Sequence, residues 1–380
     1  MDFSLSNEQR IFRGSVERVV ADFYPFDRRQ TIVATPQGFL DKHWRILAEL
    51  GWMAAPFPER YGGLNGGPIE LMLIAEQFGR RLVTLPYLST VVLGGHALLF
   101  AASEAQRAEF LPRIADGSLK AALAFAERQA RYDLCDVATT ARRESDGYVI
   151  DGQKDVVFFG QAADLMIIAA RTSGSQRSPA GITLFLVPAD ANGLTRTAYC
   201  TQDGGRATNL RFDGVHVGPS NVLGETDAGL AVLERVVDHA IAFVCAEAVG
   251  SMWAIYETTL DYLKTREQFG RTLGSFQALQ HRMVDVYIKC ELAQSMVYEV
   301  TLNLDKDPAI RRRAASAAKY AIGRYSREVG EEGIQLHGGI GMTMDVPVGH
   351  HLKRLMMINA SFGDPRHHLA AYTEAARPAA

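Results

Sequence analysis

Residues 229–266, GLAVLERVVDHAIAFVCAEAVGSMWAIYETTLDYLKTR, decide the fold class of the C-terminal third. Their apolar residues recur every three or four positions and form one stripe over seven turns: Leu230, Leu233, Val237, Ile241, Val244, Ala248, Met252 and Ile255. A helix of this length measures about 60 Å at 1.5 Å per residue. It needs helical partners, and amphipathic segments at 276–304, 309–335 and 350–375 supply three. The sequence predicts a four-helix bundle over residues 226–380.

The preceding segment, residues 121–225, has the composition of a β-sheet. Runs rich in β-branched and aromatic residues predict strands at 165–169, 183–187 and 209–217. The Asp-Gly pairs at 146–147, 151–152 and 213–214 predict turns, and alternating apolar residues around the last pair predict a hairpin with one buried face. We therefore expect a small antiparallel β-barrel or sandwich here.

Residues 1–120 are predicted to be helical, because apolar positions such as 69, 72, 73, 75 and 78 recur at helical spacing. Residues 61–68, YGGLNGGP, form a glycine-rich turn, and Ser103 with Gln106 has the spacing of a capping box. The fold class is thus α+β, with helical, β and helical domains at 1–120, 121–225 and 226–380.

Composition excludes several classes of partner. The 380 residues carry 40 basic and 43 acidic side chains, well mixed, with a formal charge of −3. This balance offers no basic surface for nucleic acid or an anionic membrane. No stretch reaches the ~20 apolar residues of a membrane span, and the first residues lack the pattern of a secretion signal. We expect a cytoplasmic protein whose four cysteines, more than 40 residues apart, are free thiols.

Two histidine pairs, His350-His351 and His367-His368, are candidate metal ligands. Neither has the i, i+4 helical spacing with a carboxylate that surrounds one ion. We predict no metal site and expect these histidines at the surface or at the rim of a substrate pocket.

Specific motifs lie in the C-terminal third: REQFG at 266–270 followed by FQALQH at 276–281, and QLHGGIGMT at 335–343. Further pieces are PERYGG at 58–63, GYVIDGQK at 147–154 and FGDPRHH at 362–368. Over essentially the whole chain they resemble the acyl-CoA dehydrogenase family. Within it, they are most similar to the small subunit of pimeloyl-CoA dehydrogenase and similar subunits of steroid-degrading heteromers.

The resemblance implies a chemistry. FAD lies between the barrel and the bundle, a carboxylate removes a proton from Cα of an acyl-CoA thioester, and hydride passes from Cβ to the flavin. The product is a trans-2-enoyl-CoA, and electrons leave through an electron-transfer flavoprotein. Because a Cα proton is weakly acidic, a positioned base and hydrogen bonds to the thioester oxygen must act together.

The resemblance further implies that the bundle of a neighbouring subunit completes the adenine and diphosphate end of each FAD. The residues at those positions are Arg266, Phe269, Gln277, Gln335, Gly338 and Gly339. Arginine and glutamine can donate to phosphate, and glycines let backbone N–H groups approach. The alternative is a surface ion pair for Arg266 and a simple helix end for the glycines.

The barrel half of the flavin site departs from the family pattern. Ala126, Val156 and Phe158 stand where the family has a threonine, a tryptophan and a second threonine that wrap the flavin ring. Alanine, valine and phenylalanine carry no side-chain donor. The sequence therefore predicts that hydrogen-bond donors to the flavin edge are missing.

The catalytic base is also missing at both positions known in the family. Phe362 occupies one, and Ala240 occupies the alternative on the long helix, where Ile241 also replaces a substrate-pocket arginine. Loss of a general base typically costs ~10²–10⁴ in rate. Asp364, two residues beyond the lost base, is the best substitute, and Glu247 on the apolar helix is a second candidate whose alternative role is a hydrogen-bonded interface carboxylate.

Three hypotheses follow. In the first, the chain is the non-catalytic subunit of a heteromeric, α2β2 acyl-CoA dehydrogenase and donates bundle residues to FAD held mainly by a homologous partner. In the second, it is an autonomous homomer that uses Asp364 as base. In the third, it is a scaffold that does not touch flavin. The resemblance points to dicarboxylic or bulky cyclic acyl-CoA substrates.

Overall fold

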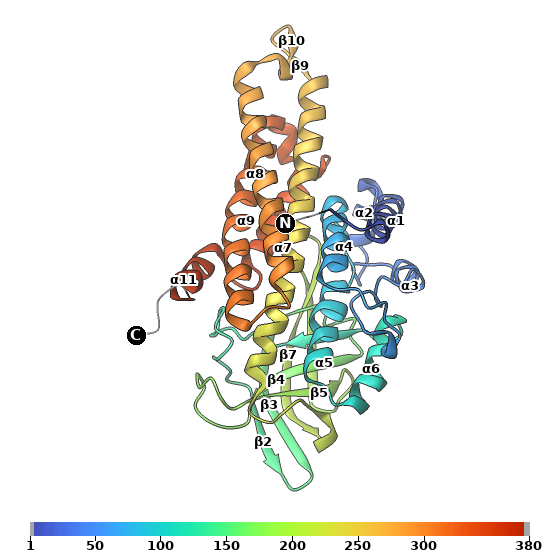
Figure 1. Ribbon diagram of the computed structural model, residues 1–380, viewed down its shortest axis with the longest axis vertical. Coiled ribbons are helices and arrows are strands. Elements are labelled where there is room, and N and C mark those ends of the chain that lie inside the picture. Colours follow the sequence, from blue (N-terminus) through green and yellow to red (C-terminus); the bar gives the residue numbers. More distant parts are fainter. Residues whose placement is uncertain (1–3, 376–380) are drawn as a thin grey trace. The chain divides into compact units, whose positions relative to one another are not determined.

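The computed structural model describes residues 4–375 (Figure 1). The chain divides into two compact units, which we name by their content. The sheet unit comprises residues 32–67 and 84–240, and the helical unit comprises residues 4–31, 68–83 and 241–375.

The helical unit is built on the long helices of the C-terminal third. Its helices are α1 (Asn7–Phe23), α2 (Phe26–Val33), α4 (Pro68–Arg81), α7 (Gly229–Thr265), α8 (Gln277–Asn303), α9 (Pro308–His337), α10 (Pro347–Ala360) and α11 (Pro365–Ala375); α2 and α7 also contribute residues to the sheet unit. A short hairpin, β9 (Glu267–Gln268) with β10 (Arg271–Thr272), links α7 to α8. The helices predicted at 229–266, 276–304 and 309–335 are therefore confirmed.

The helix predicted over 350–375 is wrong in one respect, because it is broken at residues 361–364. Phe362 has φ 57° and Gly363 has φ 114°, both incompatible with a right-handed helix. Pro365 then begins α11, where a residue without an N–H is tolerated. The break separates α10 from α11.

The sheet unit carries eight strands in one sheet (Figure 1). They are β1 (Ala121–Ala124), β2 (Thr140–Glu144), β3 (Gly147–Phe158), β4 (Leu165–Arg171), β5 (Ile182–Pro188), β6 (Leu194–Cys200), β7 (Arg206–Val217) and β8 (Val222–Leu223). The order is β6-β7-β3-β2-β4-β5-β8, with β1 beside β4. The sheet is mixed, since β1 and β2 both pair parallel with β4, and it runs from β6 to β8 without closing into the predicted antiparallel barrel.

The core of this unit explains its long apolar strands. Both faces of β4 are buried, which accounts for its continuous apolar run. The cluster includes Ile150, Met166, Ile168, Phe185 and Leu210, all at most 1% exposed. The unit's helices are α3 (Asp41–Glu49), α5 (His96–Ala101) and α6 (Glu104–Ala115), with a π-helical segment at Leu88–Gly95 and 3₁₀ turns at Glu59–Tyr61 and Pro219–Asn221. The predicted capping box of Ser103 and Gln106 is confirmed at the start of α6.

The three Asp-Gly pairs have different outcomes. The pair at 146–147 does end the turn between β2 and β3. The pairs at 151–152 and 213–214 do not form turns, because they lie opposite each other inside the continuous strands β3 and β7 at a register shift. There the N–H of Gly214 donates to the Asp151 carboxylate at 2.8 Å, so a bulge replaces the predicted hairpin.

None of the helices in the described part of the chain is long and apolar enough to cross a membrane. The four cysteines are free, as predicted, and Cys245 and Cys290 are buried in α7 and α8.

Candidate cofactor-binding site

The predicted cofactor-binding residues lie where three helices of the helical unit end or begin. The three helices contact one another through apolar residues, since Leu263 of α7, Met283 of α8 and Leu336 of α9 form one buried cluster. Beside it, the rings of Tyr262 and His337 stack with centroids 4.5 Å apart. The fold thus brings together, at one end of the bundle, residues that are up to 73 positions apart in sequence, namely Arg266, Phe269, Gln277, Gln335, Gly338 and Gly339.

The hairpin at this end has a tight turn. Phe269 and Gly270, between β9 and β10, both have positive φ, 56° and 77°. This is the conformation of a two-residue turn that matches the twist of its strands. The turn leaves the Phe269 ring 88% exposed, while the Arg271 guanidinium lies 3.9 Å from the centroid of the Phe276 ring.

Three of the polar side chains at this end are exposed and unpaired. Among the described residues, Arg266, Gln277 and Gln335 make no side-chain hydrogen bond or ion pair. Gly338 ends α9 with φ 65° and ψ −144°, a conformation that requires glycine, and a Cβ built there or at Gly339 meets no atom within 4 Å. The surface therefore offers free donors beside accessible backbone, an arrangement that can accept phosphate oxygens.

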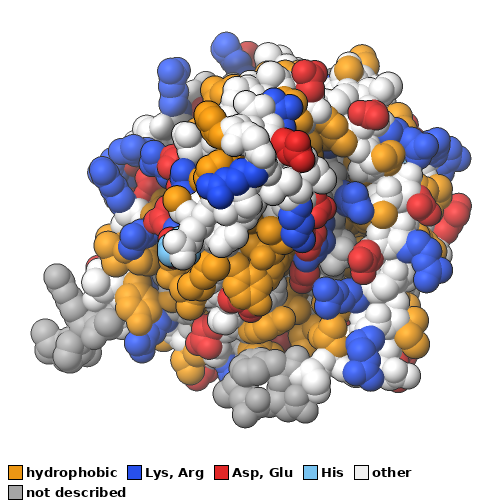
Figure 2. All heavy atoms as spheres, turned by 90° about the horizontal axis from the view of Figure 1, so that it is seen from above, with side chains coloured by type: hydrophobic (Ala, Val, Ile, Leu, Met, Phe, Trp, Pro, Cys, Tyr) orange, Lys and Arg blue, Asp and Glu red, His pale blue; other side chains and the backbone are white. Residues whose placement is uncertain are grey.

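Viewed from the end of the bundle that carries the hairpin, hydrophobic side chains gather among lysines and arginines (Figure 2). A groove of about 480 Å³ lies on α7, α8 and the turn between them, lined by Tyr256, Leu260, Leu263, Lys264, Gly274, Gln280, Met283, Val284 and Tyr287. Further along α8, Ile288 and Leu292 are each 47% exposed. Contiguous apolar patches of this kind mark interaction sites.

The segment at 361–364 is held by buried polar groups. Lys319, 1% exposed, donates to the carbonyls of Asn359 and Gly363 at 3.1 and 2.8 Å. Burial lowers the pKa of Lys319 to about 8, with the neighbouring Cys245 and Asp364 opposing that shift. The Nε2 of His368 donates to the Phe362 carbonyl at 2.9 Å. The backbone is thus fixed while the side chain it presents at 362 is phenylalanine.

The two candidate substitutes for the base have other partners. Asp364 Oδ1 accepts the N–H of His367 at 2.9 Å, as an N-cap of α11 does. Glu247 is 3% exposed, and its two oxygens accept from Arg354 at 2.6 and 2.7 Å. Glu247 is thus a buried, hydrogen-bonded carboxylate within the helical unit. Ala240 is fully buried on α7.

Three of the four paired histidines are buried, contrary to expectation, and only His367 is at the surface. His350, His351 and His368 are each at most 5% exposed, whereas His367 is exposed. His351 contacts the Ser251 hydroxyl at 3.1 Å, and its complete burial lowers its pKa to about 3. The pKa of His368 is likewise lowered to about 3, chiefly by burial. Neutral, hydrogen-bonded imidazoles therefore serve packing here.

The three positions predicted to lie at the flavin edge are together in the sheet unit. The N–H of Asp155 donates to the Ala126 carbonyl at 2.9 Å, and next to it Val156 has φ 57° and donates its N–H to Asn209 Oδ1 at 3.2 Å. Val156 is 44% exposed, and Phe158 ends β3. The apolar side chains at 126, 156 and 158 supply no hydrogen-bond donor, so only backbone N–H groups could donate to a ligand at these positions.

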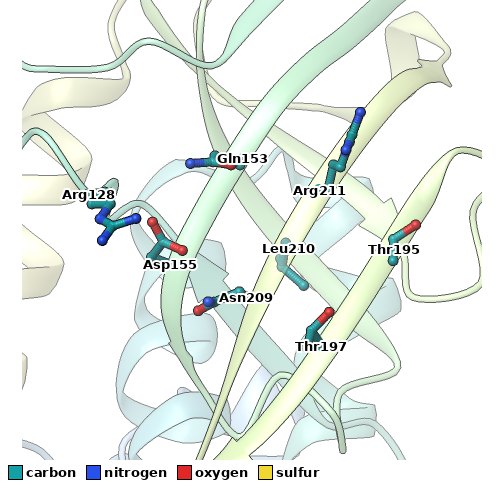
Figure 3. Close-up of a pocket in the computed structure, with 8 residues that line it drawn as sticks. All are labelled: Arg128, Gln153, Asp155, Thr195, Thr197, Asn209, Leu210 and Arg211. Carbon is teal, nitrogen blue, oxygen red and sulfur yellow. The ribbon is translucent and has the colours of Figure 1, made fainter.

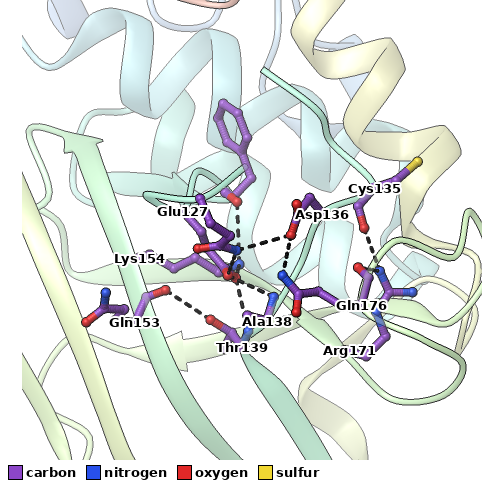
Figure 4. Close-up of polar contacts among 11 residues, drawn as sticks. Glu127, Cys135, Asp136, Ala138, Thr139, Gln153, Lys154, Arg171 and Gln176 are labelled. Carbon is purple, nitrogen blue, oxygen red and sulfur yellow. Dashed lines mark hydrogen bonds and ion pairs between the residues drawn. The ribbon is translucent and has the colours of Figure 1, made fainter. Parts of the chain in front are cut away.

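A buried ion pair orders the loop that carries Ala126 (Figure 4). Lys154 Nζ lies 2.5 Å from Glu127 Oε1, and both side chains are at most 2% exposed. Glu127 also accepts the N–H groups of Ala138 and Thr139 at 2.8 and 3.1 Å. Burial acts to raise the pKa of Glu127, but Lys154 and the hydrogen bonds from Gln129 and Ala138 outweigh it and lower the pKa. Burial lowers the pKa of Lys154 to about 8 despite the attraction of Glu127.

Sequence reasoning missed the partners in these buried networks. Lys319 stands alone in a stretch of apolar and small residues, and such isolation is a signal for a buried, paired lysine. Lys154 gives no such signal, because it lies between the polar residues Gln153 and Asp155. Their partners, Glu127 and the carbonyls of Asn359 and Gly363, are 27 to 44 residues away. No spacing rule finds such pairs.

Family models describe the three parts of the chain. Models of the acyl-CoA dehydrogenase N-terminal, middle and C-terminal domains match residues 6–118, 122–215 and 227–369. The chain belongs to the acyl-CoA dehydrogenase family. The helical, β and helical order of this family is the order that the structure has.

Relatives of the family align over nearly the full length. A probable acyl-CoA dehydrogenase of Bacillus subtilis, YngJ, is 29% identical over 96% of each chain. Among solved structures, the Tcur3481-Tcur3483 steroid ACAD is 28% identical, with a TM-score of 0.88 over 98% of each chain. Butyryl-CoA dehydrogenase of Megasphaera elsdenii is 25% identical, with a TM-score of 0.89 over 99% of each chain.

Proposed function

We propose that this acyl-CoA dehydrogenase family member is the non-catalytic subunit of a heteromeric FAD-dependent acyl-CoA dehydrogenase. It lends the end of its bundle to an FAD held mainly by a homologous subunit, in an α2β2 assembly. The observation that carries the proposal is a contrast within one chain. Donors for a dinucleotide are free at the bundle end, whereas the base position holds Phe362 and the flavin-edge positions hold apolar residues.

The residues at the bundle end fit half of an FAD. The Arg266 guanidinium matches a diphosphate oxygen pair, and Gln277 and Gln335 add neutral donors. The space over Gly338 and Gly339 is open, and the cofactor can occupy the positions into which the side chain of any other residue would project. The other half does not fit, because Ala126, Val156 and Phe158 cannot donate to the flavin edge.

FAD supplies the electron sink for α,β-dehydrogenation of an acyl-CoA thioester to a trans-2-enoyl-CoA. In our proposal this chain's contribution is to bind and orient. Arg266 neutralises phosphate charge, Phe269 covers an apolar part of the cofactor, and the glycines give backbone N–H groups close approach. Proton removal from Cα belongs to the partner, since no side chain at 362 or 240 can accept a proton.

The apolar surface of α7 and α8 supports a wide interface. The groove lined by Tyr256, Met283 and Tyr287 continues into the exposed Ile288 and Leu292. Obligate interfaces resemble a domain core cut in half, with aromatic and aliphatic anchors. One relative of this fold, the Tcur3481-Tcur3483 steroid ACAD, supports proposing a two-chain enzyme and a bulky cyclic acyl-CoA substrate.

The test is to co-express the chain with a homologous subunit that keeps the glutamate base, and to purify the complex. We expect both chains in equal amounts by native mass spectrometry, with acyl-CoA oxidation coupled to an electron-transfer flavoprotein. Replacing the partner's glutamate by glutamine should abolish turnover. Phe362→Ala in this chain should leave turnover within twofold.

Two outcomes would select the other hypotheses. Turnover by this chain alone, lost in Asp364→Asn, would make it an autonomous homomer. A mixed complex whose flavin retention is unchanged by Arg266→Ala would make it a scaffold. Residual turnover after removal of the partner's base would refute the proposed division of labour.

A further inference from the structure

A polar pocket of about 260 Å³ lies on the solvent-facing side of three strands of the sheet unit (Figure 3). It is lined by Arg128, Gln153, Asp155, Thr195, Thr197, Asn209, Leu210 and Arg211. All of these residues belong to the sheet unit. Of these residues, only Gln153 lies in one of the motifs quoted above for the acyl-CoA dehydrogenase family.

The pairing of strands β3, β7 and β6 arranges the polar side chains of the pocket in two rows. Arg211 of β7 is paired with Gln153 of β3 on one side and with Thr195 of β6 on the other. One row further along, Asn209 of β7 is paired with Thr197. Because alternate residues of a strand face the same side, these side chains share one face, while Leu210 between them packs into the core. The rows are polar throughout.

A bulge adds an acceptor to the second row. The register of β3 and β7 shifts between Lys154 and Val157, so that Asp155 and Val156 stand opposite Asn209 alone. Figure 3 shows the Asp155 carboxylate beside Arg128 at one side of the pocket, with Thr195 and Thr197 on the strand at the other side. Oδ2 of Asp155 is buried and accepts no hydrogen bond from the described residues.

The charged and hydroxyl groups of the pocket are available to a ligand. Within the described chain, Arg128 and Arg211 form no ion pair or hydrogen bond through their guanidinium groups, and the hydroxyls of Thr195 and Thr197 are equally unpaired. Two guanidinium groups and one carboxylate leave a net positive charge. Guanidinium, hydroxyl and amide groups together are typical donors to phosphate oxygens. The single carboxylate requires a donor on the ligand.

From this arrangement we infer that the pocket is a binding site for a phosphate monoester that carries a neighbouring hydroxyl group. Arg128, Arg211 and the threonine hydroxyls bind the phosphate, and Asp155 accepts the hydroxyl of the ligand. The volume of about 260 Å³ falls below the ~300–1,000 Å³ of sites for drug-sized ligands, so the pocket can enclose a small phosphate ester but not a whole dinucleotide or acyl-CoA. The inference is independent of the proposed role in flavin binding.

Binding is measured by calorimetry on the full chain, with glycerol 3-phosphate and inorganic phosphate as probes and sodium chloride at matched ionic strength as reference. Glycerol 3-phosphate should bind more tightly than inorganic phosphate, because only it has a hydroxyl for Asp155. Arg211→Ala and Arg128→Ala should each weaken its binding by about tenfold to a hundredfold, the usual effect of losing a charged hydrogen bond. Arg143→Ala, which removes an exposed arginine from the neighbouring strand β2, is the control and should change binding less than twofold.

Asp155→Asn tests the hydroxyl partner separately. It should reduce the preference for glycerol 3-phosphate over inorganic phosphate, while phosphate itself binds equally or more tightly because a negative charge is gone. All variants are checked for an unchanged circular dichroism spectrum and melting temperature. Absence of binding by both probes at millimolar concentration would overturn the site, as would equal weakening by Arg143→Ala. Equal affinity for the two probes, unaffected by Asp155→Asn, would overturn the monoester assignment in favour of free phosphate.

Discussion

The loop network around Glu127 and the end of the bundle around Arg266 contain similar polar groups. Those of the loop are buried and paired, whereas those of the bundle end are exposed and unpaired within the described chain. At the loop, Lys154 and two backbone N–H groups saturate the Glu127 carboxylate inside the protein. At the bundle end, Arg266, Gln277 and Gln335 are exposed, and within the described chain their side chains are unpaired. Buried polar groups are normally paired within the protein, whereas exposed, unpaired donors are available to a ligand.

The largest change in stability is expected when one partner of the buried Glu127–Lys154 pair is removed. Lys154→Met leaves the Glu127 charge buried without its cation and should lower the free energy of unfolding by about 3–5 kcal/mol, measured by urea denaturation. The double variant Glu127→Gln with Lys154→Met should recover part of the loss, because no uncompensated charge remains. Single variants that lose less than about 1 kcal/mol would contradict a structural role for the pair.

The bundle end should behave in the opposite way. Arg266→Ala should leave the unfolding free energy within about 0.5 kcal/mol, since the side chain is exposed and unpaired within the described chain. In the mixed complex it should weaken FAD retention by about tenfold to a hundredfold, followed by flavin fluorescence during dialysis. Arg327→Ala removes an exposed arginine that pairs with Glu331 and serves as control. Unchanged flavin retention in Arg266→Ala would remove this residue from the cofactor site.

A third prediction concerns pH and the buried histidines. Burial lowers the pKa of His351 to about 3, against ~6.5 in an unfolded chain. As pH falls below ~6.5, the unfolded chain takes up a proton that the folded chain refuses, so stability falls by up to ~1.4 kcal/mol per pH unit for this group. His351→Gln should make the pH dependence of the urea midpoint shallower between pH 6.5 and 4.5. The same slope in wild type and variant would show that His351 does not contribute to the pH dependence of stability. The control is His281→Gln, which replaces an exposed histidine.

The smallest effect is expected at Asp364. Asparagine caps a helix as well as aspartate does, so Asp364→Asn should change stability by less than about 0.5 kcal/mol and leave turnover of the mixed complex unchanged. Asp364→Ala should cost ~1 kcal/mol through loss of the cap at α11. Loss of turnover in Asp364→Asn, with stability intact, would identify a catalytic base and refute the structural assignment.

The sequence was informative where local chemistry decides structure. Helical periodicity predicted α7, α8 and α9, and the Ser103 capping box marked the start of α6, because these depend on residues within a few turns. The same local reasoning failed at Asp213-Gly214, since pairing with β3 converted a turn signal into a bulge. It also failed at 361–364, where Lys319 and His368 from outside the segment fix the helix break.

The binding-site residues likewise fall into those that local sequence motifs predicted and those that depend on tertiary pairing. The motifs around residues 266–281 and 335–343 were recognisable, and the fold brings them together through the Leu263, Met283 and Leu336 cluster. The pocket between Arg128 and Arg211 was not recognisable, because it depends on the register of three strands and a bulge at Asp155. The burial of His350, His351 and His368 was equally unpredictable from residue spacing.

The most direct test of the central claim is the flavin content of the chain alone and in complex with its full-site partner. Absorbance at the flavin band, with protein measured by amino-acid analysis, gives FAD per chain in both preparations. Our account predicts a colourless isolated chain and one FAD for each pair of unlike chains in the complex. A yellow, isolated chain with one tightly bound FAD per protomer would contradict it.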